Sequence, residues 1–118
     1  MHELSIILEM VKTVESRISV ADGERVVSIK LEIGEMSSAV PRYLKEYFPE
    51  AVNDTVLEGA DLEIEIVPAM AKCKGCGMEF NFLENRGICP GCGGMELSLV
   101  SGREFYIKEI IVDSNSNM

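Results

Sequence analysis

The order of apolar and polar positions predicts two helices in the first half of the chain. Across residues 4–18, apolar side chains recur every three or four positions, which is typical of a helix that buries one face. The expected buried face comprises Leu4, Ile7, Leu8, Val11, Val14 and Ile18. Gly23 can end this helix because glycine adopts positive φ without strain.

A second helix is expected across residues 41–48, since Pro41 suits the first turn of a helix. Pro49 has no N–H with which to continue the hydrogen-bond ladder, and proline disfavours helical backbone at the residue before it. We therefore expect the second helix to be short or kinked.

Alternation of apolar and polar residues predicts strands at 24–34, 61–68 and 102–113, the last with apolar residues on both faces. On the first strand the expected buried side chains are Val27, Ile29, Leu31 and Ile33. The chain order predicts an α+β fold in which a small sheet of about three strands packs with two helices. The strands on either side of the intervening insert could pair with each other, which would place the insert on a two-stranded stalk.

The insert contains two pairs of cysteines, Cys73 with Cys76 and Cys89 with Cys92, and twelve residues separate the pairs. Glycine precedes and follows the second cysteine of each pair, which permits a tight turn around the sulfurs. Two such turns that face each other form a closed tetrahedral site of four thiolates, which suits a structural zinc ion. The spacing alone also permits iron, because CPGCG resembles a rubredoxin knuckle. A catalytic dithiol is a poorer interpretation, since it needs one pair at a helix start.

These patterns predict two domains: residues 70–99 as an inserted zinc-ribbon domain, and residues 1–69 and 100–118 as the α/β domain that receives it. No apolar run approaches the ~18 residues of a membrane helix, and no basic stretch precedes an apolar block as in a signal peptide. Paired cysteines in such a chain fit a reducing environment, so a cytoplasmic protein with no membrane partner is expected.

The composition excludes several classes of function. The 118 residues carry a formal net charge of -9, and so acidic a surface repels the phosphate backbone of nucleic acid. The sequence shows no paired carboxylate motif, phosphate-binding loop, or nucleophile with a histidine partner. We therefore expect a binding protein and not an enzyme.

The chain opens MHELS, and His2 is its only histidine. A solvated terminal residue is the simplest interpretation. The alternative is a chelate, in which the Met1 α-amine, the His2 amide nitrogen and the His2 imidazole close fused rings on one ion. Square-planar nitrogen ligation suits nickel(II) or copper(II), and Glu3 could add its amide or its carboxylate.

Five segments together resemble the HypA/HybF family of hydrogenase maturation proteins: MHELS, LEIGEMS, EGADLEIEIVPAMAKCKGCG, CPGCGG and LVSGREFYIKEI. The resemblance implies a nickel-binding α/β domain with an inserted zinc ribbon. It also implies delivery of nickel to a [NiFe]-hydrogenase large-subunit precursor, together with the GTPase HypB. By position, Met1, His2 and Glu3 would be the nickel ligands. The four cysteines would be the zinc ligands.

The sequence departs from the family's pattern in two places. Pro49 interrupts the second helix, and the cysteine insert has no second histidine that could turn toward nickel. Any further nickel ligand must be a carboxylate, a backbone group or water. Glu35, in a loop near the second helix, is one such carboxylate, although loop carboxylates are usually solvated.

Overall fold

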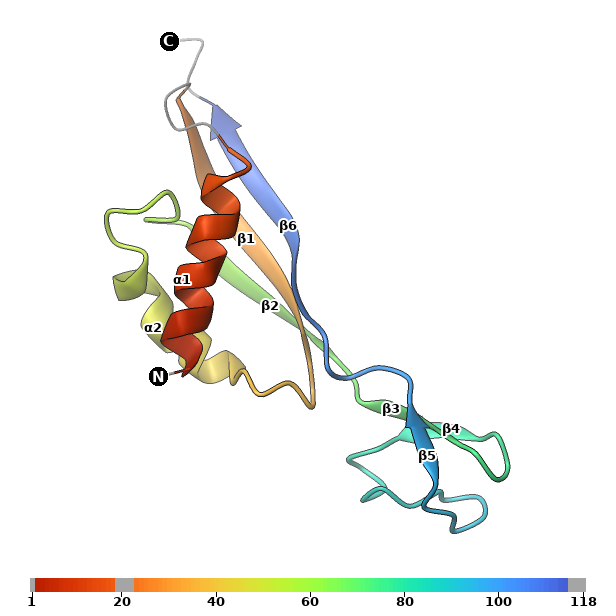
Figure 1. Cartoon of the computed structure of the whole chain (residues 1–118). Helices are drawn as coiled ribbons and strands as arrows, with labels where there is room; N and C mark the ends of the chain where they lie inside the picture. Colours follow the sequence, from red (N-terminus) through yellow and green to blue (C-terminus); the bar gives the residue numbers. More distant parts are fainter. Residues whose placement is uncertain (1, 19–22, 115–118) are drawn as a thin grey trace. The chain divides into compact units, whose positions relative to one another are not determined.

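The structure is a computed structural model that describes residues 2–18 and 23–114, without the side chains of His2 and Ser114. Its helices and strands are α1 (His2–Glu15), β1 (Glu24–Gly34), α2 (Pro41–Ala51), β2 (Asp61–Val67), β3 (Met70–Cys73), β4 (Glu79–Asn81), β5 (Leu97–Leu99) and β6 (Phe105–Ser114) (Figure 1). They form two three-stranded sheets, with strand orders β2-β1-β6 and β4-β3-β5. The predicted fold class, two helices with a small sheet and an inserted cysteine module, is confirmed.

The chain divides into two compact units. We call residues 1–31, 38–65 and 106–118 the helical unit, and residues 32–37 and 66–105 the cysteine unit. None of the helices in the described ranges is long and apolar enough to cross a membrane.

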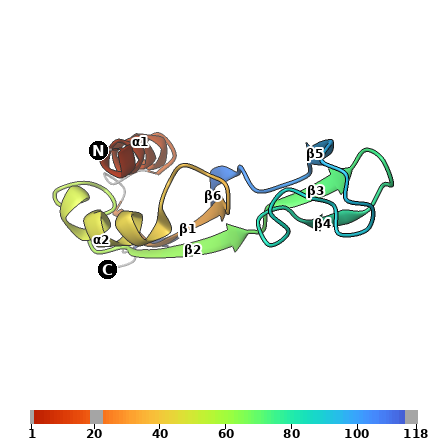
Figure 2. The same cartoon turned by 90° about the horizontal axis from the view of Figure 1, so that it is seen from below.

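Helix α1 buries one stripe of apolar residues and packs against α2 (Figures 1 and 2). The stripe consists of Ile7, Met10, Val11 and Val14, each no more than 6% exposed. The prediction that Leu4 and Leu8 belong to the buried face is wrong, since they are 38% and 47% exposed. At 100° per residue both positions lie to one side of the stripe that faces the core.

Helix α2 continues past the proline that was expected to limit it. Pro49 lies inside the helix, which ends at Ala51. Leu44 and Phe48 are buried, so the packing of this face stabilises the helix although Pro49 contributes no N–H.

Strand β1 lies between β2 and β6. The expectation that the strands flanking the insert pair with each other is therefore wrong. Ile29, Leu31 and Ile33 on β1 are fully buried as predicted, whereas Val27 is 45% exposed. A strand with these apolar side chains removes the most apolar area from water at the centre of the sheet, which favours that place for β1.

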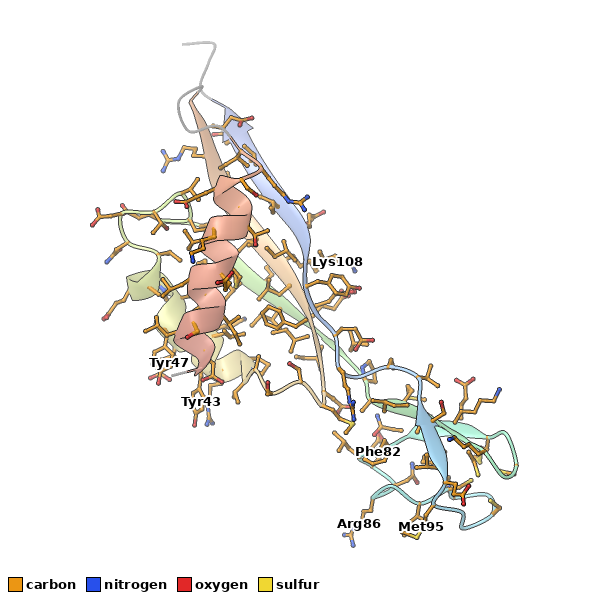
Figure 3. The ribbon with its side chains drawn as sticks, in the orientation of Figure 1. Tyr43, Tyr47, Phe82, Arg86, Met95 and Lys108 are labelled. Carbon is orange, nitrogen blue, oxygen red and sulfur yellow. The ribbon has the colours of Figure 1, made fainter. Side chains whose placement is uncertain are left out.

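Polar side chains connect the three strands of the helical unit. The Glu65 carboxylate on β2 lies 3.6 Å from the Lys30 ammonium on β1 and 2.9 Å from the Lys108 ammonium on β6 (Figure 3). Nearby, the Ser28 hydroxyl donates to the Glu63 carboxylate at 3.3 Å. Exposed ion pairs contribute little free energy, roughly 0–1 kcal/mol each, so these contacts add little to the stability of the sheet.

Candidate metal sites

The two cysteine pairs form two turns with the same backbone hydrogen bonds. Gly77 N–H donates to the Cys73 carbonyl at 2.8 Å, and Gly93 N–H donates to the Cys89 carbonyl at 2.8 Å. Both glycines have positive φ, 81° and 76°, which explains why glycine follows each pair.

The repetition extends one residue further. Cys73 N–H donates to the Met78 carbonyl at 2.9 Å, and Cys89 N–H donates to the Gly94 carbonyl at 2.9 Å. Each turn therefore holds its first cysteine with the same pair of bonds, one to its carbonyl and one from its amide.

The two turns bring all four thiols together. Their sulfur atoms lie within 4.8 Å of one another. The Cys73 and Cys92 sulfurs are 3.6 Å apart, and those of Cys76 and Cys89 are 3.5 Å apart. A tetrahedral site with metal–sulfur bonds of about 2.3 Å places its sulfurs about 3.8 Å apart. The four residues therefore fit a zinc ion, while the separations are too long for disulfides.

The apolar core beneath the cysteines is small. It consists of Ala71, Cys73, Phe80 and Cys89, with Phe82 and Leu97 packed against it. In the β4-β3-β5 sheet, Ala71 pairs with Phe80 on one side and with Leu99 on the other. Two of the four core residues are themselves cysteines, so a metal bound to them would directly stabilise half of this core.

Backbone N–H groups and neighbouring thiols shift the pKa values of Cys73 and Cys92 in opposite directions. The backbone N–H of Cys76 stabilises the Cys73 thiolate and is the largest cause of its lowered pKa of about 7. For Cys92 the largest single effect, the Gly94 N–H, lowers the pKa, but the neighbouring thiols outweigh it and raise the pKa to about 12. Four thiolates in this space repel one another, and a bound cation removes that repulsion.

The loop carboxylate considered as an additional nickel ligand is engaged inside the cysteine unit. Glu35 Oε1 accepts a hydrogen bond of 2.8 Å from the Ala69 N–H and one of 3.3 Å from the Asn81 side-chain amide. Glu35 N–H donates to the Val67 carbonyl at 2.9 Å. Glu35 therefore joins the end of β1 to the segment that leads into β3. No pattern in the sequence predicts this role.

The three residues predicted to hold nickel lie at the start of the helical unit. Met1 and the His2 side chain lie outside the described residues, and the His2 backbone begins α1. Glu3 is 9% exposed, and its Oε2 accepts a hydrogen bond of 3.3 Å from the Val40 N–H at the start of α2. The sequence analysis did not foresee this contact.

The comparison with curated proteins gives relatives that are similar over almost the whole chain. The hydrogenase maturation factor HypA of Chlorobium limicola is 37% identical over 113 residues, which cover 96% of this chain and 97% of the relative. That of Geobacter metallireducens is 41% identical over 113 residues, covering 96% of this chain and 100% of the relative.

Two solved structures share the fold. The solution structure of a HypA protein has a TM-score of 0.65 at 19% identity and covers 98% of this chain and 97% of its own. The solution structure of the Ni metallochaperone HypA from Helicobacter pylori has a TM-score of 0.60 at 17% identity and covers 92% and 94%.

A family described as hydrogenase/urease nickel incorporation, metallochaperone, HypA matches residues 1–112. This description and the names of the relatives denote a maturation factor and not an enzyme. The match begins at the first residue and extends through both pairs of cysteines into β6. The chain therefore belongs to the HypA family of nickel-incorporation metallochaperones.

Proposed function

We propose that this protein binds Ni(II) at its amino terminus, through Met1, His2 and Glu3, and delivers it during maturation of [NiFe]-hydrogenase. The observation that carries the proposal is the match to a nickel-incorporation family, which includes the opening residues. The curated relatives are named hydrogenase maturation factors, which favours hydrogenase over urease as the client.

The amino terminus has the donors that such a site needs. The first N–H groups of a helix have no partner within the helix, so the His2 and Glu3 amides at the start of α1 are suitably placed for metal ligation. The terminal amine and the imidazole of the chain's only histidine complete a nitrogen-rich set, which suits square-planar nickel(II). An ion held at a chain end exchanges readily, as delivery requires.

The four cysteines, in this proposal, hold a structural zinc ion. Their sulfur separations fit tetrahedral thiolate ligation, and the closed site leaves no position for a substrate. Residues 70–99 then act as a zinc-ribbon domain, and residues 1–69 and 100–118 as the nickel-binding domain. Zinc supplies folding free energy here, and nickel is the cargo.

We further propose that the protein acts in the cytoplasm with a HypB-type GTPase and a [NiFe]-hydrogenase large-subunit precursor. Delivery needs timing, and this sequence has no phosphate-binding loop of its own. The exposed Leu4 and Leu8 on α1 lie close in sequence to the proposed nickel ligands and offer apolar area to a partner.

The decisive experiment compares nickel binding by three proteins with defined amino termini: the wild type, His2→Ala, and a form with Gly-Ser added before Met1. Both changes should abolish tight nickel binding and leave zinc content and fold intact. The first removes the imidazole, and the second converts the terminal amine into an amide. Nickel binding by the extended form that equals the wild type would show that the amine is not a ligand.

A further inference from the structure

The carboxylate of Glu3 is bonded to a different helix from the one that carries it. Glu3 lies in the first turn of α1 and is 9% exposed, and its Oε2 accepts the Val40 N–H at 3.3 Å. Val40 is the N-cap residue of α2 and makes no side-chain cap hydrogen bond of its own. The N–H at the start of α2 therefore finds its hydrogen-bond acceptor in the first turn of α1.

This contact reproduces half of a capping box. In that motif a Glu at the third helical position accepts a hydrogen bond from the N-cap N–H. In α2 the third position is Tyr43, which has no carboxylate, and the first is Pro41, which has no N–H (Figure 3). Negative charge is favoured at a helix start, so the first turns of α1 and α2 both stabilise the Glu3 carboxylate where it lies.

We propose that the Glu3 carboxylate is a positioning group that fixes the nickel-binding terminus against the start of α2. Glu3 then serves nickel through its backbone amide, and its carboxylate stays with Val40. The inference rests on the proposed function, in which nickel binds at Met1, His2 and Glu3. Helix ends fray, and ligands that are already held in place lose less conformational freedom when the metal binds.

Two substitutions separate a positioning carboxylate from a ligating one. Glu3→Gln keeps a carbonyl oxygen for the Val40 N–H but replaces a good metal ligand with a poor one. If the carboxylate only positions the terminus, nickel affinity should stay within about threefold of the wild type. Glu3→Ala removes the acceptor and should weaken nickel binding at least about tenfold and lower the thermal midpoint by about 4 °C. Glu9, 74% exposed on the same helix, gives matched controls as Glu9→Gln and Glu9→Ala, which should change neither quantity.

A second-site variant separates positioning from general stability. Tyr43→Glu places a carboxylate at the third position of α2, where it can accept the Val40 N–H from within the helix. Glu3→Ala combined with Tyr43→Glu should recover the thermal midpoint but not the nickel affinity, because the terminus is still untethered. Recovery of both together would overturn the positioning role.

The Val40 amide provides a direct readout. Its hydrogen exchange should be slow in the wild type and in Glu3→Gln, with or without nickel, and fast in Glu3→Ala. Fast exchange on adding nickel to the wild type would show that the carboxylate moves to the metal and would overturn the inference.

Comparison with His2→Ala distinguishes a failure of the positioning role from a failure of the proposed function. Loss of nickel by Glu3→Gln as complete as that by His2→Ala would overturn only the inference. Wild-type nickel affinity in His2→Ala would overturn both.

Discussion

The backbone of Gly34, at the end of β1, packs directly against the backbone of Gly102. A Cβ on Gly34 would overlap the Gly102 carbonyl group, and one on Gly102 would lie 2.6 Å from the Ala69 Cα. Two hydrogen bonds join the same segments, from Gly34 N–H to the Glu104 carbonyl at 2.8 Å and from Met36 N–H to the Gly102 carbonyl at 2.7 Å. Three stretches of the cysteine unit are thus held together where only glycine fits.

Gly34→Ala should destabilise the protein by about 3 kcal/mol, because the added methyl group meets backbone that cannot rotate away. Gly59→Ala is the matched control. Gly59 has a φ of 79° with nothing within 4 Å of its Cβ position, so Gly59→Ala should destabilise the protein by only about 1 kcal/mol, through backbone strain. Urea unfolding measures both changes. Equal losses of unfolding free energy in the two variants would mean that the backbone at Gly102 moves away to accommodate the methyl group.

Cys73→Ser should release zinc and unfold residues 70–99, since a structural zinc site supplies on the order of 10 kcal/mol of folding free energy. Helices α1 and α2 should remain, because Ile7, Val14 and Leu44 form an apolar core of their own. Zinc analysis and amide hydrogen exchange report the two outcomes. Lys74→Ala, in the turn after Cys73, is the control and should keep its zinc. If Cys73→Ser keeps one zinc per chain and slow amide exchange across residues 70–99, the four-thiolate site is refuted.

Zinc affinity should fall as the pH falls, because zinc binds thiolates and competes with protons. Cys73 has a lowered pKa of about 7, whereas Cys92 has a raised pKa of about 12 and must lose its proton when zinc binds. Below about pH 7 Cys73 is protonated as well, so one more proton is displaced and the dependence on pH becomes steeper. Chelator competition between about pH 6 and pH 8 measures this slope. An affinity that does not change with pH would contradict thiolate ligation.

Local patterns predicted the elements, and distant contacts decided their details. The spacing of Ile7 and Val14 identifies α1. Leu4 and Leu8, beside the buried stripe, fit the same spacing, and only the packing against the rest of the fold shows that they are exposed. The central place of β1 and the helix past Pro49 also depend on tertiary packing, which overrides local preference.

The candidate sites divide in the same way. The cysteine cluster was predictable because spacing and glycines within each turn determine its geometry. The carboxylates of Glu3 and Glu35 accept backbone N–H groups 37 and 34 residues away, at Val40 and Ala69. No periodicity or motif encodes a pairing between residues so far apart in the sequence.

The proposed GTPase partner should bind the exposed side of α1, near the proposed nickel ligands. Leu8 is 47% exposed, and Leu8→Ser should weaken binding of the purified GTPase by about threefold to tenfold, since covering the exposed half of a leucine contributes roughly 0.7–1.4 kcal/mol. Met95, in the cysteine unit, is 74% exposed and makes a stringent control, because Met95→Ser removes a more exposed apolar side chain (Figure 3). Binding measured by calorimetry should be unchanged in Met95→Ser and should survive removal of zinc. Equal losses of GTPase binding in Leu8→Ser and Met95→Ser would contradict a binding surface on α1. A partner bound there would contact Leu8 and not Met95.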